Sequence, residues 1–124
     1  MARNAASIPW SSEYPDEERA NFHRWYNGAA PVGCFPLGAT PEGVYDLAGN
    51  VWEWTRSEYR DYPYDPSDRR EDCSNPAEKL FTVRGGSWVN LSLYLRASNR
   101  DQFNPDLYVN LLGFWLIRRR EQNR

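Results

Sequence analysis

Hydrophobic positions are unevenly spread along this chain, and they predict short strands rather than long helices. The densest apolar stretch is 44–55, where the Gly-Asn pair at 49–50 is typical of a tight turn. The alternation that follows favours a short strand over 51–54. Residues 80–84 predict a second strand that ends at a Gly-Gly pair, and 113–117 predict a final one.

The remaining segments are polar or lack a clear period. The first 30 residues contain scattered aromatic anchors, and 16–22 predict a single helical turn. The segment 31–41 is a loop spaced by Pro and Gly, and 56–79, charged and rich in Tyr, predict a long surface loop. Over 87–112 neither the helical nor the strand period is sustained. These features predict one loop-rich domain over 1–124 with many short strands.

Composition narrows the possible functions. The net charge of −2 argues against a polycationic nucleic-acid binder, and an aromatic content of 15% indicates a folded chain. No apolar run approaches the roughly 20 residues of a membrane span, and no signal peptide is recognised, so the default expectation is cytoplasmic. A domain cut from a longer cell-surface protein would have the same features. Cys34 and Cys73 allow one disulfide, although a free pair is the expectation.

Ordered motifs carry a resemblance to a known family. They are Pro-Val-Gly-Cys-Phe-Pro at 31–36, Gly-Val-Tyr-Asp-Leu-Ala-Gly-Asn-Val-Trp-Glu-Trp at 43–54, Val-Arg-Gly-Gly-Ser-Trp at 83–88, and Arg-Ala-Ser-Asn-Arg at 96–100 with Asn-Pro-Asp and Gly-Phe beyond it. Together they resemble the formylglycine-generating-enzyme (sulfatase-modifying factor) family. The resemblance implies a loop-rich α+β fold of the C-type-lectin type with short antiparallel strands. The family's N-terminal half has no match, which implies a C-terminal portion or an unusually short member, with a missing N-terminal segment or larger parent chain as a candidate partner.

The same resemblance implies that the chain is not an enzyme. Catalytic members carry two cysteines after the Gly-Gly-Ser-aromatic motif, and the corresponding places here hold Asn90 and Leu95. Neither residue forms a thiolate or binds copper. Related iron-dependent sulfoxide synthases need several histidines, and His23 is the only one in this sequence. The alternative is an oxidoreductase of either type that has lost, or never had, its catalytic residues.

The segment 84–117 resembles more specifically the variable region of diversity-generating retroelement variable proteins. There, adenines in an Asn-rich template are replaced during copying, so an AAC codon becomes any codon ending in C. The resemblance implies a non-catalytic protein that binds a protein ligand, with neither nucleic acid nor membrane as partner. The candidate ligand-binding residues are Val89, Asn90, Leu91, Leu93, Tyr94, Asp101, Phe103, Leu107, Tyr108, Val109, Leu111 and Trp115.

A physical argument supports this reading of 84–117. The run Leu91, Leu93, Tyr94, Leu95 would point side chains to both sides of a strand, so part of it must be exposed. Exposed apolar and aromatic side chains normally mark a binding surface. The alternative is that these residues belong to the core of two ordinary strands.

Two further expectations concern the scaffold. The family's turn at 46–53 can hold a structural Ca²⁺, which would take side-chain oxygens from Asp46 and Glu53 and the carbonyls of Gly49 and Val51. In the alternative reading these carboxylates bond arginines or backbone amides, and no metal is required. Arg84 and Arg96 are expected to be partly buried and to donate to the carbonyls of irregular loops.

Overall fold

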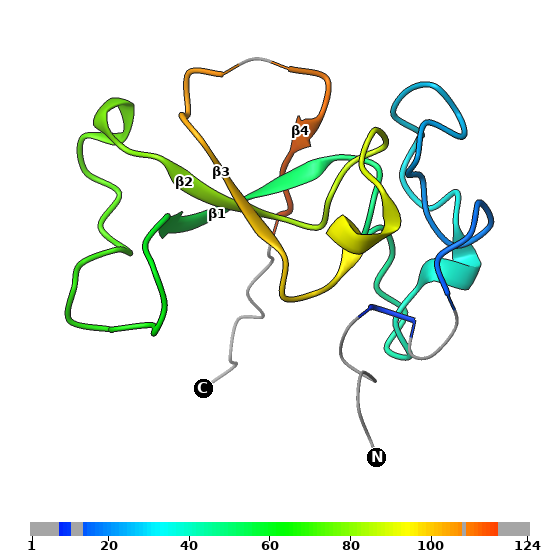
Figure 1. The fold of residues 1–124 in the computed structure, drawn as a ribbon, viewed down its shortest axis with the longest axis horizontal. Helices are drawn as coiled ribbons and strands as arrows, with labels where there is room; N and C mark the ends of the chain where they lie inside the picture. Colours follow the sequence, from blue (N-terminus) through cyan, green and yellow to red (C-terminus); the bar gives the residue numbers. More distant parts are fainter. Residues whose placement is uncertain (1–7, 11–13, 108, 117–124) are drawn as a thin grey trace, which may run out of the picture.

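The computed structural model describes residues 8–10, 14–107 and 109–116, and within them four short strands form one mixed sheet. The strands are β1 (Trp52–Glu58), β2 (Phe81–Arg84), β3 (Arg100–Phe103) and β4 (Leu112–Gly113), in the order β3-β2-β1-β4 (Figure 1). β2 is antiparallel to both β1 and β3, whereas β4 pairs parallel with β1. Three 3-10 helices lie in the connections: η1 (Pro36–Gly38), η2 (Pro76–Glu78) and η3 (Ser92–Leu95).

The sequence predictions for the strands are partly confirmed. β2 lies where it was predicted, and β1 begins as predicted but continues to Glu58, into the segment predicted as loop. The final strand is only Leu112–Gly113, which begins one residue before the predicted 113–117 and shares only Gly113 with it, while Ile117 lies outside the described residues. The strand β3 was not predicted. The sequence of β3, Arg-Asp-Gln-Phe, is polar because this edge strand exposes Asp101 and Gln102. The predicted helical turn at 16–22 is a hydrogen-bonded turn, in which Ala20 donates to the carbonyl of Asp16.

The two faces of the sheet have opposite characters. Strand register places Trp54 beside Val83, and Phe81 beside Phe103, so one face is apolar. The other face carries Arg84, with Arg100 opposite it on β3 and Glu53 opposite it on β1. The sheet therefore presents an apolar side and a polar side that carries two arginines.

The turn at Gly49 and Asn50 joins three loop segments. Both residues have left-handed backbones, with φ of +75° and +67°, which confirms the predicted tight turn. Gly49 donates to Gly85 (2.7 Å) and Asn50 to Asn21 (2.7 Å), while the Asn50 carbonyl accepts from Trp88 (2.8 Å). A Cβ at position 49 would lie 2.5 Å from the Asn21 carbonyl oxygen, so only glycine fits.

The side chain of Asn50 extends this network. It is buried, and its Oδ1 accepts from the Ala30 amide (2.8 Å) and from Asn21 Nδ2 (3.1 Å). Its Nδ2 donates in turn to the Ala30 carbonyl (3.1 Å). One residue thus satisfies backbone groups of loops that no strand pairs.

A small apolar core lies beside this turn. Ile8 packs against a buried cluster made of Trp10, Ala20, Phe22, Ala48 and Leu95. Leu95 comes from η3, so the core holds that helix against the N-terminal loops. Among the residues that the structure describes, no helix has the length and apolar character needed to cross a lipid bilayer.

The network predicts the stability of two asparagine variants. Asn50→Ala should lower the free energy of unfolding by about 2–4 kcal/mol, because it leaves the backbone amide and carbonyl of Ala30 without these partners and removes one of the two hydrogen bonds that Asn21 Nδ2 donates. Asn75→Ala is the matched control, since Asn75 is exposed, has φ of +49° and makes no side-chain cap. It should show only the cost of a left-handed alanine, about 1 kcal/mol. Urea unfolding measures both, and equal losses would contradict the role given to the Asn50 amide.

Candidate functional site

The structure exposes many of the candidate ligand-binding residues. Leu91 and Leu93 are 52% and 57% exposed and Trp115 is 45% exposed, although all three are large and apolar. Tyr94, Asp101, Leu107 and Val109 are also exposed. The half-buried members are Val89, Asn90, Phe103 and Leu111. Tyr108 lies outside the described residues.

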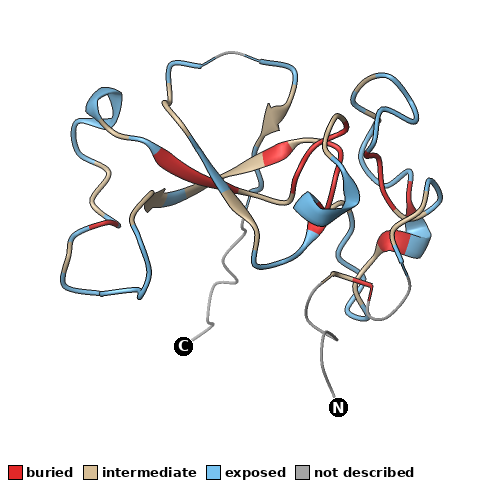
Figure 2. Ribbon diagram, viewed as in Figure 1, coloured by how far each residue is buried: buried red, intermediate tan, exposed pale blue. Residues whose placement is uncertain are grey.

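Three of the exposed residues lie on or beside η3. The run 91–95 was considered as a strand, but residues 92–95 form a 3-10 helix. Its tight turn sends Leu95 into the core at 1% exposure and leaves Leu91, Leu93 and Tyr94 outside, so η3 is exposed apart from its last residue (Figure 2). Part of the run is exposed, as the sequence indicated.

A second group surrounds an apolar groove of about 540 Å³ between the sheet and the loop 104–111. Its lining comprises Trp54, Pro105, Leu107, Val109, Asn110, Leu112, Gly113 and Phe114. Trp54 also contacts Phe103 edge-to-face, with ring centroids 6.5 Å apart. Trp54 and Phe114 were missed as candidate site residues. The alternation along β1, which places Trp54 on the apolar face, is the signal that could have found Trp54.

One segment links the two groups. The Trp88 indole donates to the carbonyl of Asn110 in the groove (3.2 Å), and the Asn90 side chain accepts from the Ser87 amide (2.9 Å) and hydroxyl (2.6 Å). Asn90 therefore stabilises a turn rather than presenting a free amide. Among the described residues, those around η3 do not line the groove. That all the candidate residues form one surface stays a prediction.

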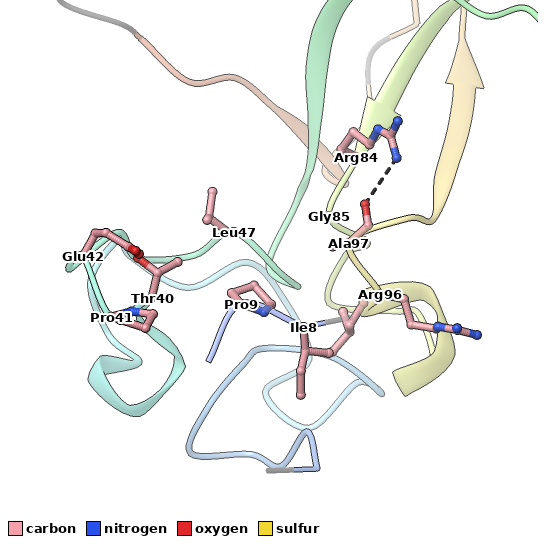
Figure 3. A pocket seen from close by; sticks show the side chains of 11 residues that line it. Ile8, Pro9, Thr40, Pro41, Glu42, Leu47, Arg84, Gly85, Arg96 and Ala97 are labelled. Carbon is pink, nitrogen blue, oxygen red and sulfur yellow. Dashed lines mark hydrogen bonds between the residues drawn. The ribbon is translucent and has the colours of Figure 1, made fainter. Parts of the chain in front are cut away.

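A separate cavity of about 420 Å³ lies where 8–9, 40–42 and 95–97 meet, and Figure 3 shows its lining. Arg84 is half-buried, as predicted, and donates to the carbonyls of Ala97 (3.3 Å) and Asn99 (3.4 Å). The prediction for Arg96 is wrong: its side chain is exposed and points away from the cavity. Arg96 follows η3, where the burial of Leu95 turns the next residue outward.

The turn proposed for calcium brings two carboxyl groups near each other. Asp46 has φ of +57°, and its Oδ2 accepts from the Gly33 amide (2.8 Å). This bond to a backbone amide is the alternative to calcium binding that the sequence left open for Asp46. Burial raises the pKa of Glu53 from 4.5 to about 7; a hydrogen bond from the Trp115 side chain opposes this shift, and the charge of Asp46 adds to it. A cation here would favour the charged form of Glu53.

Side chains alone do not make a complete metal site. The described part of the chain contains no group of three or more His, Cys, Asp or Glu side chains able to hold a metal. The calcium prediction draws its other ligands from the carbonyls of Gly49 and Val51, which suits a hard cation. The set of Asp46, Gly49, Val51 and Glu53 therefore stays a prediction.

Comparison with known proteins gives one family over most of the chain. Residues 2–120 match the profile described as Sulfatase-modifying factor enzyme 1-like domain. Hercynine oxygenase of Mycobacterium tuberculosis is 36% identical over an alignment of 99 residues, which spans 78% of this chain and 23% of that protein. Inactive C-alpha-formylglycine-generating enzyme 2 of Bos taurus is 30% identical over 110 residues, spanning 85% and 31% respectively. The chain thus spans less than a third of the length of these relatives.

A solved structure supports the fold. Treponema denticola variable protein 1 superposes with a TM-score of 0.69 at 24% identity, covering 91% of this chain and 41% of that one. Together with the family match, it confirms the predicted C-type-lectin-like, loop-rich α+β fold.

The raised pKa of Glu53 predicts a pH dependence of stability. Between about pH 4.5 and 7 the folded carboxyl keeps a proton that the unfolded one has lost. The free energy of unfolding should therefore fall as pH rises through this window and level off above it. Chelator-treated protein tested by urea unfolding at several pH values should show this slope, and Glu53→Gln should flatten it. An equal slope in both proteins would contradict the assignment.

The calcium prediction at the same turn is tested by thermal melts. At pH 8, Ca²⁺ should raise the melting temperature and a chelator should lower it, because an ion bound only to the native state stabilises it by mass action. Asp46→Ala should respond to neither. Identical melting curves of the parent with and without chelator would contradict the calcium prediction.

Proposed function

This chain belongs to the sulfatase-modifying factor enzyme 1-like family, and we propose that it is a non-catalytic member that binds a protein ligand. In this proposal the segment 84–117 is a variable region diversified by a retroelement. The likeness in fold to Treponema denticola variable protein 1 supports the proposal.

One observation carries it: large apolar residues in 84–117 are exposed while their neighbours are buried. Leu93 is 57% exposed and Leu95 is 1% exposed, two residues apart on one short helix. Trp88 is 7% exposed and Trp115 is 45% exposed. Chains normally bury residues of this size, and exposed patches of them mark interaction sites. The buried set acts as scaffold, and the exposed set is available to a partner.

The positions of the missing catalytic cysteines also favour a binding role. Asn90 accepts two hydrogen bonds from Ser87, and Leu95 is packed in the core beside Ala20 and Phe22. Asn90 and Leu95 therefore both stabilise the fold. The relative named as an inactive formylglycine-generating enzyme agrees with a non-catalytic member of the family.

The similarity to hercynine oxygenase supports a second candidate, an oxidoreductase-type domain without its catalytic residues. In that case 84–117 would carry no diversified codons. The two candidates therefore differ in the DNA around the gene.

The genomic test is direct. The locus should contain a near-copy of codons 84–117 beside a reverse-transcriptase gene, differing only where the copy has adenine. Sequencing the gene from many cells should show changes at codons such as 93 and 109. The codons of Trp88 and Leu95 should stay constant, as an internal control. A locus with no such copy would favour the second candidate.

Paired substitutions on η3 test the division into scaffold and display. Leu91→Ser with Leu93→Ser should keep the melting temperature within a few degrees of the parent, because exposed substitutions cost about 0.5 kcal/mol or less each. Leu95→Ala, on the same helix, should lower the free energy of unfolding by about 2–5 kcal/mol. Thermal melts and urea unfolding measure both variants. If the double variant unfolds as readily as Leu95→Ala, these leucines are core and the binding proposal fails.

A further inference from the structure

The polar face of the sheet, opposite the apolar groove, borders a small cavity of about 130 Å³. Its lining comes from β1, β2 and β3 and from the loop that follows β1. The charged and hydroxyl-bearing residues that matter here are Glu58, Tyr62, Tyr64, Arg70, Arg84 and Arg100.

The positive charge of this cavity is only partly neutralised. Arg70 is buried and paired with Asp68 (2.6 Å), and Glu58 is paired with Arg60 (3.1 Å). Within the described residues, neither Arg84 nor Arg100 has a carboxylate partner. Two half-buried guanidinium groups therefore share one cavity without counter-ions.

Arg100 is held rigidly in place. Its guanidinium lies over the rings of Tyr59 and Tyr62, 4.3 and 3.9 Å from their centroids, and its Nη1 donates to the Arg60 carbonyl (2.6 Å). Contacts of this kind orient a guanidinium at little entropic cost. Within the described residues this is the one hydrogen bond that the Arg100 guanidinium donates, so its remaining N–H groups are available to a ligand.

Arg84 and Tyr62 complete the set of donors. Arg84 Nη2 donates to the Tyr62 hydroxyl (3.3 Å), which leaves the hydroxyl's own proton free to donate. The hydrogen bond from Arg84, together with the charges of Arg84, Arg100 and Arg70, lowers the pKa of Tyr62. The cavity therefore has a positive potential as well as converging donors.

We propose that this cavity binds a small oxyanion, such as phosphate or sulfate, free or as the terminal group of a larger ligand. Arg84 and Arg100 supply the charge, and the Tyr62 hydroxyl supplies a further hydrogen bond. A cavity of about 130 Å³ admits one such group, and the rest of a larger ligand would lie outside it. The site lies on the other face of the sheet from the apolar groove, and the two share no lining residue.

Isothermal titration and thermal melts with sodium phosphate, against sodium chloride at matched ionic strength, test the proposal. Phosphate should bind the parent and raise its melting temperature above that in chloride. Arg100→Gln should weaken binding by about tenfold or more, because charge-assisted hydrogen bonds are lost. Arg69→Gln is the matched control, since Arg69 is exposed and paired with Asp72 outside the cavity, and it should bind as the parent does. No difference between phosphate and chloride, or unchanged binding by Arg100→Gln, overturns the proposal.

Tyr62→Phe provides a variant that keeps the ring over Arg100 and removes only the hydroxyl. It should fold and bind phosphate more weakly. The difference in phenolate absorbance between the parent and this variant reports the ionisation of Tyr62. Bound phosphate should shift this ionisation to higher pH, since an anion beside Tyr62 disfavours its charged form. An unchanged titration overturns the site. Phenyl phosphate distinguishes a free oxyanion from the terminal group of a larger ligand. If it binds at least as tightly as phosphate, the site takes a terminal group, and if it binds more weakly, the site takes the free ion.

Discussion

The pairing of backbone groups around Asn50 is the constraint on which this fold depends. Much of the chain is loop, and loops cannot satisfy their amides and carbonyls in a sheet ladder. Asn50 replaces the ladder by bonding segments near Asn21, Ala30 and Trp88 at once. Gly49 must be glycine because the Asn21 carbonyl lies too close for any side chain. The left-handed turn at 49–50 thereby connects loop segments through hydrogen bonds, as a central strand connects its neighbours in a sheet.

This arrangement explains how the chain can expose large apolar residues without unfolding. Stability comes from the Asn50 network, the cluster around Phe22 and the buried strand β2, none of which includes the exposed side chains of η3. Gly86 allows η3 to pack closely, since a Cβ there would lie 2.9 Å from the Tyr94 carbonyl oxygen. The proposed function would need such a scaffold, whose stability depends little on its exposed residues.

The sequence was informative where local chemistry decides the structure. The Gly-Asn turn, β2 and the partial exposure of 91–95 all follow from turn propensity and hydrophobic pattern. The strand β3 could not be predicted, because an exposed edge strand carries no alternation to detect. The exposure of Arg96, the groove at Trp54 and the arginines around Tyr62 depend on which loops fold back onto the sheet. That is a property of the tertiary structure, and local sequence does not contain it.

Trp115 connects an exposed position of 84–117 to the turn at 46–53. Its side chain is exposed, yet it makes a hydrogen bond that lowers the pKa of the half-buried Glu53. An arginine at this position would stabilise the Glu53 carboxylate more strongly through its full charge. Arginine would thus favour the charged form of Glu53, whereas tryptophan leaves its pKa near 7. The residue at position 115 therefore influences the charge of Glu53, so a substitution at this exposed position would also alter the electrostatics of the turn that carries Asp46.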